Sequence, residues 1–225
     1  MLEFSNIKVY DLKESVIASR NAMRIEMPSY TEEEFTIALQ RAKILAKCGG
    51  GSGHSNFRKG IRVSFDMKYT QYITKQFQRY HFFDYVSSSS LMHRIVKMDF
   101  SKCVNKYVTK QSIKQMQQLI NQYNAFVEDK TDKHIFYLEN GEIIQANTHQ
   151  EVLYYQYMFI ISNCPMGTEL FVRVSTNYEQ LATIYKQRRN HKLKEDWSAF
   201  YKMVEELPYF NELILEKNGK NDETN

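Results

Sequence analysis

The spacing of apolar residues predicts helices and strands along the whole chain. Apolar residues that recur every three or four positions bury one side of a helix, whereas alternation of apolar and polar residues buries one face of a strand. The clearest N-terminal signal is a capping box, Thr31 with Glu34, followed by helical spacing up to the glycines that begin at Gly49. In this half, the pattern predicts strand 7–12, helix 13–23, helix 31–45, strand 61–67 and a helix over 69–80.

The second half of the chain also has residue patterns that predict both helices and strands. An Asn-Gly pair at 140–141 is a strong signal for a β-hairpin. A second capping box, Thr148 with Glu151, opens a helix that is apolar on nearly all sides and should be buried, and Pro165 ends it. The predicted elements here are helix 113–126, hairpin strands 134–139 and 142–146, helix 148–161, strand 169–175, helix 178–185 and a last helix around 197–204.

These elements predict a single α+β domain over 1–216, with a mixed or antiparallel sheet flanked by helices and a polar tail at 217–225. Neither an internal repeat nor a linker is evident. Hydrophobic residues make up 43% of the 225 positions and Gly plus Pro only 11, which excludes disordered and collagen-like classes. The apolar stretch 152–161 is too short for a bilayer, and the first residues lack a signal-peptide pattern, so we expect a cytoplasmic protein without membrane contact.

Net charge and cysteine content narrow the possible functions only slightly. Thirty Lys and Arg against 26 Asp and Glu give a net charge of +4, which suits an anionic ligand but is far from that of a dedicated nucleic-acid binder. The cysteines at 48, 103 and 164 are widely spaced, so we expect free thiols. No histidine pair has the i, i+4 spacing of a helical zinc site, so no metal is expected.

Two segments have both a structural and a functional interpretation. The glycine-rich segment 49–60 lacks the residue order of a phosphate-binding loop, and a connecting loop is favoured. The run 186–194 holds six basic or imidazole side chains in nine residues. It fits either a solvated helix end, where cations complement the helix dipole, or a phosphate site, because arginine binds phosphate oxygens in a bidentate way.

The segment 76–94 carries the strongest functional signal. Gln76 and Arg79 are three residues apart and share a helix face. Four serines at 87–90 follow, so that hydroxyl and N–H donors lie close in sequence to His81 and Arg94. Such a density of polar donors favours an anionic ligand over a core helix.

At these residues the sequence resembles the flavin-dependent thymidylate synthase family. The family signature runs R-H-R-x-x-S-x-x-x-x-S-x-R after a glutamine lead-in. Gln76-x-x-Arg79 matches the lead-in and the first arginine, Tyr80-His81 stands at the family's His-Arg, and Ser89 falls on the second serine.

Two further blocks fit at family spacing without gaps. Gly53-His54 precedes Gln76 as the family's G-H-x-x-x-x-E-H segment does. Pro165, Asn177 and Arg188 follow the spacing of its L-P…N-x-R-x-L-x-x-F-x-x-L-R segment. The resemblance covers most of the chain and is weakest over 97–147.

The resemblance implies a specific site and reaction. Family members are homotetramers with active sites shared between subunits. They bind FAD and use methylenetetrahydrofolate and NADPH as co-substrates to methylate dUMP to dTMP. The implied catalytic residues are Arg79, His81 and Ser89. The implied FAD-binding residues are His54, Asn56, Arg79, His81, Asn177 and Thr183. The implied substrate-binding residues are Gln76, Ser89, Arg94 and Arg188, with Arg188 facing the nucleotide phosphate.

Several positions depart from the family pattern. The substitutions are Lys59-Gly60 for Glu-His, Tyr80-His81 for His-Arg, Asp84 for the first serine, Leu91 and Ile161 for arginines, Glu179 for an arginine and Thr183 for an asparagine. These changes leave open a related pyrimidine nucleotide as substrate. They also leave open a catalytically inactive protein that binds nucleotide or single-stranded nucleic acid through aromatic and basic residues of 79–85 and 186–194.

Overall fold

A computed structural model describes residues 1–48 and 53–215, which form two compact units. The first, here called the sheet unit, comprises residues 1–68, 75–88 and the chain from 171 onward. The second, the helical unit, comprises residues 69–74 and 89–170. The predicted glycine stop at 49–51 and the polar tail at 217–225 lie outside the described residues. The single domain over 1–216 stays a prediction.

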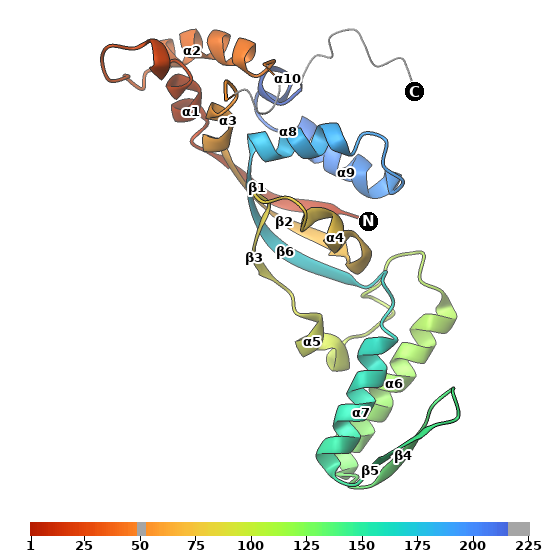
Figure 1. Cartoon of the computed structure of the whole chain (residues 1–225). Helices are drawn as coiled ribbons and strands as arrows, with labels where there is room; N and C mark the ends of the chain where they lie inside the picture. Colours follow the sequence, from red (N-terminus) through yellow and green to blue (C-terminus); the bar gives the residue numbers. More distant parts are fainter. Residues whose placement is uncertain (49–52, 216–225) are drawn as a thin grey trace. The chain divides into compact units, whose positions relative to one another are not determined.

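An antiparallel sheet forms the centre of the sheet unit (Figure 1). The strand order is β1 (Glu3–Tyr10), β2 (Arg62–Thr70), β6 (Glu169–Asn177) and β3 (Asp84–Ser88). β1 pairs with β2 and β3 with β6 in antiparallel register. Arg62 contacts Ser175 while Asp66 contacts Arg173, so β2 and β6 also run in opposite directions.

The sheet buries the face that the alternation of β2 predicts. Ile61, Val63, Phe65 and Met67 are fully buried. Phe77 stacks on Phe83 with ring centroids 4.6 Å apart and joins an aromatic core with other rings of the unit. The helices that lie wholly in this unit are α1 (Leu12–Ala18), η1 (Asn21–Met23), α2 (Glu32–Leu45), α3 (Phe57–Gly60), α8 (Tyr178–Gln187), α9 (Lys194–Glu205) and α10 (Phe210–Leu213).

The structure differs from the prediction in two places here. The helix predicted over 69–80 is present only at 71–77, as the short helices η2 (Gln71–Ile73) and α4 (Thr74–Phe77), because 69–70 are the end of β2. Tyr69 and Thr70 are 3% and 0% exposed, and aromatic and β-branched side chains favour an extended backbone here. The second difference is β3, a strand that the sequence pattern did not predict and that includes Ser87 and Ser88.

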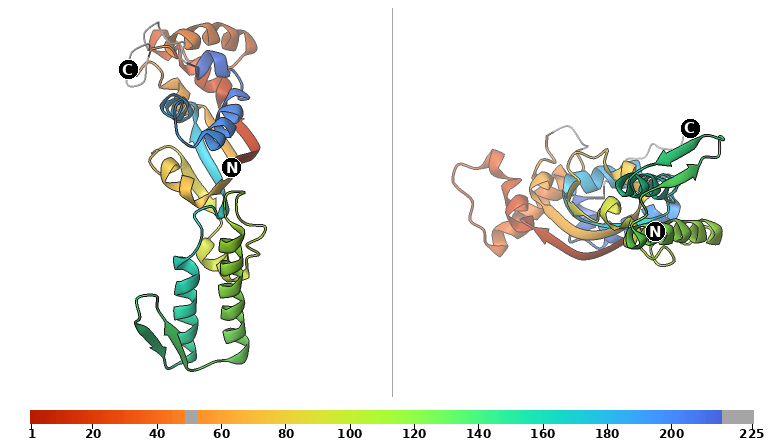
Figure 2. Two further views of the ribbon diagram at one scale, coloured as in Figure 1. Left: turned by 90° about the vertical axis from the view of Figure 1, so that its right-hand side faces the viewer. Right: turned by 90° about the horizontal axis from the view of Figure 1, so that it is seen from below.

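The helical unit consists of paired helices, a hairpin and short connecting helices. α6 (Lys110–Asp129) and α7 (His149–Ser162) lie side by side, and the hairpin of β4 (His134–Tyr137) and β5 (Ile143–Ala146) joins them (Figure 2). α5 (Leu91–Arg94) and η3 (Ile95–Lys97) precede this pair. One apolar cluster includes Phe100 and Ile160, and another surrounds Phe136.

The local signals of this unit were confirmed in detail. Thr148 accepts a hydrogen bond from the Glu151 N–H at 3.3 Å, as the first box does between Thr31 and the Glu34 N–H at 3.1 Å. Gly141 has φ +87° in the predicted hairpin.

The expected burial of α7 was wrong. Val152, Gln156 and Ile160 are buried, but Tyr154 is 58% and Met158 41% exposed. The helix therefore packs one side in a single chain and leaves another apolar side uncovered. None of the described helices is long and apolar enough to cross a membrane.

Candidate functional site

Helix α8 is the element on which the three matched sequence segments meet. It follows β6 directly, and Asn177 caps it by accepting a hydrogen bond from the Gln180 N–H at 2.9 Å. Its C-terminal cap is Arg188. Side chains of segments 53–60 and 76–83 bond to the two ends of this helix, so residues far apart in the sequence converge within the sheet unit.

Arg188 and Tyr80 form the contact at the C-terminal end. Arg188 Nε donates to the Tyr80 hydroxyl oxygen at 2.7 Å, and Arg188 Nη2 lies 3.5 Å from the carbonyl oxygen of Gln76. The Tyr80 hydroxyl donates in turn to Gln187 Oε1 at 3.2 Å. Burial raises the pKa of this hydroxyl and the charge of Arg188 acts in the opposite direction. Two predicted substrate-binding residues, Gln76 and Arg188, are therefore brought together.

The backbone of the turn after α4 is hydrogen-bonded to α8 and to the end of β6. The Phe82 N–H donates to Gln180 Oε1 at 3.3 Å, and the Thr176 hydroxyl donates to the Phe82 carbonyl oxygen at 2.7 Å. Arg79 and His81, two of the three predicted catalytic residues, are exposed on this turn. The turn is thus held at its backbone while these two side chains face solvent.

A buried ion pair fastens the first matched segment to the N-terminal end of α8. Arg58 is 1% exposed, and its Nε donates to Glu179 Oε2 at 2.6 Å. Arg58 Nη1 also donates to the Leu213 carbonyl oxygen at 3.2 Å, and the Ser55 hydroxyl donates to Glu179 Oε1 at 3.3 Å. Glu179, an acid where the family has an arginine, therefore neutralises a buried cation.

Of the predicted flavin-binding residues near this ion pair, some are exposed and others are used in hydrogen bonds within the fold. His54 and Asn56 are exposed close to this ion pair in sequence. Asn177 is 3% exposed and uses its side-chain oxygen to cap α8. The Thr183 hydroxyl donates to the Glu179 carbonyl oxygen at 3.0 Å, inside the helix. Gly60, at a family histidine position, has the Ser15 side chain where a Cβ would lie.

Ser89 and Arg94 belong to the helical unit, and both are half-buried there. Ser90 rather than Ser89 caps α5, since its hydroxyl oxygen accepts from the His93 N–H at 3.3 Å. The part of Ser89 and Arg94 in a shared site stays a prediction.

Sequence reasoning missed two residues of this arrangement. Tyr80 had been noted only as a departure from the family pattern, and Arg58 had not been singled out. A signal for Arg58 does exist in the sequence, because a basic pair at 58–59 accompanies the acid at 179 and so reverses the charges of the family pattern at 59 and 179. Among residues 1–48 and 53–215, no three His, Cys, Asp or Glu side chains are grouped to hold a metal ion.

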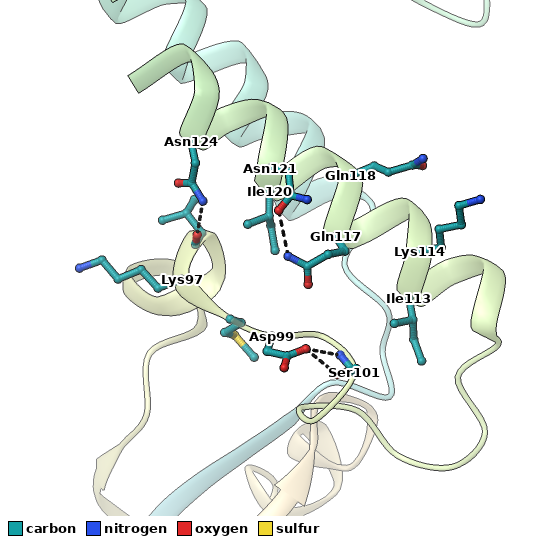
Figure 3. Close-up of a pocket in the computed structure, with 12 residues that line it drawn as sticks. Lys97, Asp99, Ser101, Ile113, Lys114, Gln117, Gln118, Ile120, Asn121 and Asn124 are labelled. Atoms are coloured by element: carbon teal, nitrogen blue, oxygen red, sulfur yellow. Dashed lines mark hydrogen bonds between the residues drawn. The ribbon is translucent and has the colours of Figure 1, made fainter. Parts of the chain in front are cut away.

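The helical unit contains a separate cavity of about 640 Å³ between η3 and α6 (Figure 3). Gln117 Nε2 donates to Asn121 Oδ1 at 3.1 Å, and Asn124 Nδ2 donates to the Val96 carbonyl oxygen at 3.3 Å. These two side-chain amides therefore donate hydrogen bonds to nearby groups of the protein. None of the sequence-predicted site residues lines this cavity.

Comparisons with known proteins define the fold. No model of a protein family matches the chain, and no curated protein sequence matches it. Among solved structures it is similar to a flavin-dependent thymidylate synthase ThyX from Helicobacter pylori in complex with FAD and dUMP. That match has a TM-score of 0.59 and 11% identity, covering 93% of this chain and 98% of that one. The fold is that of a flavin-dependent thymidylate synthase.

A second structure of the Helicobacter pylori enzyme with FAD and dUMP gives the same result, with a TM-score of 0.57 and 12% identity over 97% of this chain and 100% of that one. The resemblance read from three short motifs is therefore confirmed for the thymidylate synthase fold. So is the predicted α+β architecture with an antiparallel sheet. At this identity the similarity concerns the fold alone.

Proposed function

We propose that this chain is a divergent flavin-dependent thymidylate synthase-like enzyme that binds FAD and methylates dUMP, or a closely related pyrimidine nucleotide. Methylenetetrahydrofolate would supply the one-carbon group and NADPH the electrons. The observation that carries the proposal is the convergence of the three motif segments on α8, with Gln76 and Arg188 in contact. Proteins with this fold and 11–12% identity bind FAD and dUMP.

The donor set of the sheet unit fits a flavin. A flavin supplies redox chemistry, and its reduction places negative charge near the N1 and C2 carbonyl positions of the ring, where a protein cation stabilises it. Arg79 and His81 are exposed on a turn whose backbone is fixed, and His54 and Asn56 are exposed next to the buried Arg58–Glu179 pair. Because Glu179 is paired with Arg58, its charge does not oppose an anionic ligand as a free carboxylate would.

Each side chain then has a definite task. Arg79 and His81 would hold the flavin and stabilise charge on it, while the backbone bonds of Phe82 keep their turn in place. Gln76 and Arg188 would hold the nucleotide. The hydroxyl of Tyr80 orients the Arg188 guanidinium through the 2.7 Å bond.

Loss of two family arginines at positions 91 and 161 predicts weak nucleotide binding. Each charge-assisted hydrogen bond contributes about 1.5–3 kcal/mol, so losing two lowers affinity by roughly two to four orders of magnitude unless Arg94 or Arg189 replaces them.

A titration of the purified protein with FAD, followed by dUMP, tests the proposal. We expect flavin absorbance to shift on binding and again on addition of dUMP, and Arg79→Gln to weaken flavin binding at least tenfold. Arg41→Gln, on the exposed side of α2, is the matched control and should bind as the unaltered protein does. Equal flavin binding by Arg79→Gln and Arg41→Gln, or no binding at all, would refute the proposal.

A homotetramer is part of the same proposal. The apolar side of α7 that includes Tyr154 and Met158 is uncovered in one chain, and contact with another subunit would remove it from water. Light scattering should give a tetramer mass, reduced by Met158→Glu and unchanged by Gln150→Glu at an exposed polar position of the same helix. A monomer mass for the unaltered protein would contradict this part.

One observation favours the alternative of a non-catalytic nucleotide or single-strand binder. Phe82 is 56% exposed between His81 and the buried Phe83, and an exposed ring beside basic residues can stack on a base. Oligonucleotide binding that weakens steeply with salt and is lost in Phe82→Ala, in a protein that takes up no flavin, would support it. Binding of flavin with no oligonucleotide binding would exclude the single-strand binder.

A further inference from the structure

The charged residues of the helical unit are segregated along its two long helices. Between positions 100 and 127 the chain contains no acidic residue and four lysines, Lys102, Lys106, Lys110 and Lys114, which are here called the basic end. Between positions 128 and 151 it contains two lysines and six acidic residues. This second segment, here called the acidic end, includes the last residues of α6, the hairpin and the first residues of α7 (Figure 1).

Helix α7 runs from the acidic end to the basic end. At its start, His149 Nδ1 lies 2.9 Å from the carbonyl oxygen of Thr131, which places the acidic segment after α6 there. Beyond its last turn, the Asn105 N–H donates to the carbonyl oxygen of Gly167 at 3.0 Å, which places the segment with Lys102 and Lys106 there.

Two acids also lie at the basic end. Asp99 Oδ2 is 3.2 Å from Lys102 Nζ, and Glu169 follows α7 in the chain. Four lysines against these two carboxylates leave the basic end positively charged, whereas six acids against two lysines leave the acidic end negatively charged.

The charges on α6 oppose the dipole of this helix. The N-terminus of a helix carries a partial positive charge and its C-terminus a partial negative one, so acids stabilise the first turn and cations the last. Helix α6 has the reverse order, because Lys110 is its first residue and Glu128 and Asp129 are its last. All three side chains are exposed. The stability of the helix itself therefore does not account for this order, which points to an interaction outside the helix.

The middle of the two long helices has no charged side chain. Residues 115–127 of α6 and 152–162 of α7 contain none. Tyr154 and Met158, which are 58% and 41% exposed, lie four residues apart in this part of α7 and share its uncovered apolar side. An apolar surface therefore lies between two ends of opposite charge.

We propose that a second copy of this chain packs on α7 in antiparallel orientation about a two-fold axis. The uncovered apolar sides of the two α7 helices are then in contact, and the basic end of each copy faces the acidic end of the other. A two-fold contact uses the same surface on both copies, which a strip with an apolar middle and opposite ends permits. A parallel pair would bring like charges together at both ends. This inference rests on the homotetramer of the proposed function and names the arrangement of two of its subunits.

Reversal of charge at either end tests this orientation. Lys110→Glu/Lys114→Glu makes the basic end negative, and Glu128→Lys/Asp129→Lys/Asp132→Lys makes the acidic end positive. Either set alone places like charges opposite each other and should raise the dissociation constant of the pair about tenfold or more, measured by sedimentation equilibrium. Both sets in one chain exchange the two ends and should restore the dissociation constant to within about threefold. The changes at positions 110, 128 and 129 suit the dipole of α6, so the variants should fold, which circular dichroism checks.

Lys47→Glu/Lys202→Glu is the matched control, because it changes the net charge as Lys110→Glu/Lys114→Glu does, at exposed lysines of the sheet unit. It should leave the dissociation constant unchanged. The proposal is overturned if the control weakens association equally, or if the chain with both reversals associates as weakly as either single set.

The remaining outcomes separate this inference from the proposed function. An unaltered protein that is a monomer would refute both the antiparallel pair and the homotetramer, while the titration with FAD and dUMP tests the enzyme independently. A tetramer whose mass none of the reversals changes would refute the antiparallel pair alone. If Lys110→Glu/Lys114→Glu instead abolished salt-sensitive oligonucleotide binding without changing the mass, the basic end would be a nucleic-acid contact and the proposal would be wrong.

Discussion

The contacts inside the sheet unit differ in kind from the contacts inside the helical unit. In the sheet unit, buried charges and hydroxyl groups connect segments more than one hundred residues apart, as Arg58 with Glu179 and Tyr80 with Arg188 do. In the helical unit, many contacts are between neighbouring elements, and α6, the hairpin and α7 follow one another in both sequence and space. The candidate site residues lie where distant segments of the sheet unit meet, because buried ion pairs and hydrogen bonds there hold those segments together.

The largest expected effect tests the buried ion pair of the sheet unit. Glu179→Ala leaves Arg58 buried without its carboxylate, and removal of one partner of such a pair costs about 3–5 kcal/mol. Urea unfolding should show this loss. The control is Glu3→Ala, which removes an ion pair to Lys68 whose side chains are 65% and 40% exposed and should cost less than about 1 kcal/mol. Similar losses in both variants would show that the Arg58–Glu179 pair has no special role.

A core truncation in the helical unit should come next in size. Ile160 is fully buried in the cluster with Phe100 and Met116, and Ile→Ala at such sites costs about 2–5 kcal/mol. Ile161→Ala, at the neighbouring half-buried position, is the control and should cost clearly less. Unfolding followed by amide hydrogen exchange would locate the loss within α6 and α7. An equal loss of protection in β1 and β2 would contradict the view that the helical unit depends on local contacts.

How far sequence predicted the structure differs between the same two regions. Local rules located both capping boxes, the 140–141 turn and the alternation of β2, because each depends on residues within one turn of helix or one hairpin. They failed at Tyr69 and Thr70, because strand β2 continues through these residues despite their helical spacing. They also failed at α7, because its apolar composition does not indicate which side of the helix is buried.

The candidate site was predictable in its residues but not in its bonds. Motif spacing selected Gln76, Arg79 and Arg188, and the structure brings Gln76 and Arg188 into contact. The role of Glu179 was missed, because it depends on a partner at position 58, more than one hundred residues away. Contacts between residues so far apart in the chain do not produce a periodic pattern in the sequence. Asn177 caps α8, whose start at 178 agrees with the prediction, although the resemblance assigned this residue to the flavin.

The contact between Arg188 and Tyr80 permits a double-mutant cycle. Tyr80→Phe removes the acceptor of Arg188 Nε, and Arg188→Gln removes the donor. Hydrogen bonds to charged groups contribute about 1.5–3 kcal/mol, and the partial exposure of Arg188 places the coupling free energy of unfolding at the lower end of this range, about 1.5 kcal/mol. Strictly additive single and double variants would mean that this bond does not help to hold Arg188 at the candidate nucleotide site.

The smallest effect concerns a single glycine in the helical unit. Gly141 has φ +87° in the turn between β4 and β5, and a Cβ there would meet no atom within 4 Å. Gly141→Ala therefore adds backbone strain without a steric clash and should cost about 1 kcal/mol, measured by urea unfolding. Gly141→Asn is the control, because asparagine tolerates the left-handed region better, and it should recover part of the loss. If the alanine variant were as stable as the unaltered protein, the hairpin would not set the stability of the helical unit, and contacts between α6 and α7 would have to account for it.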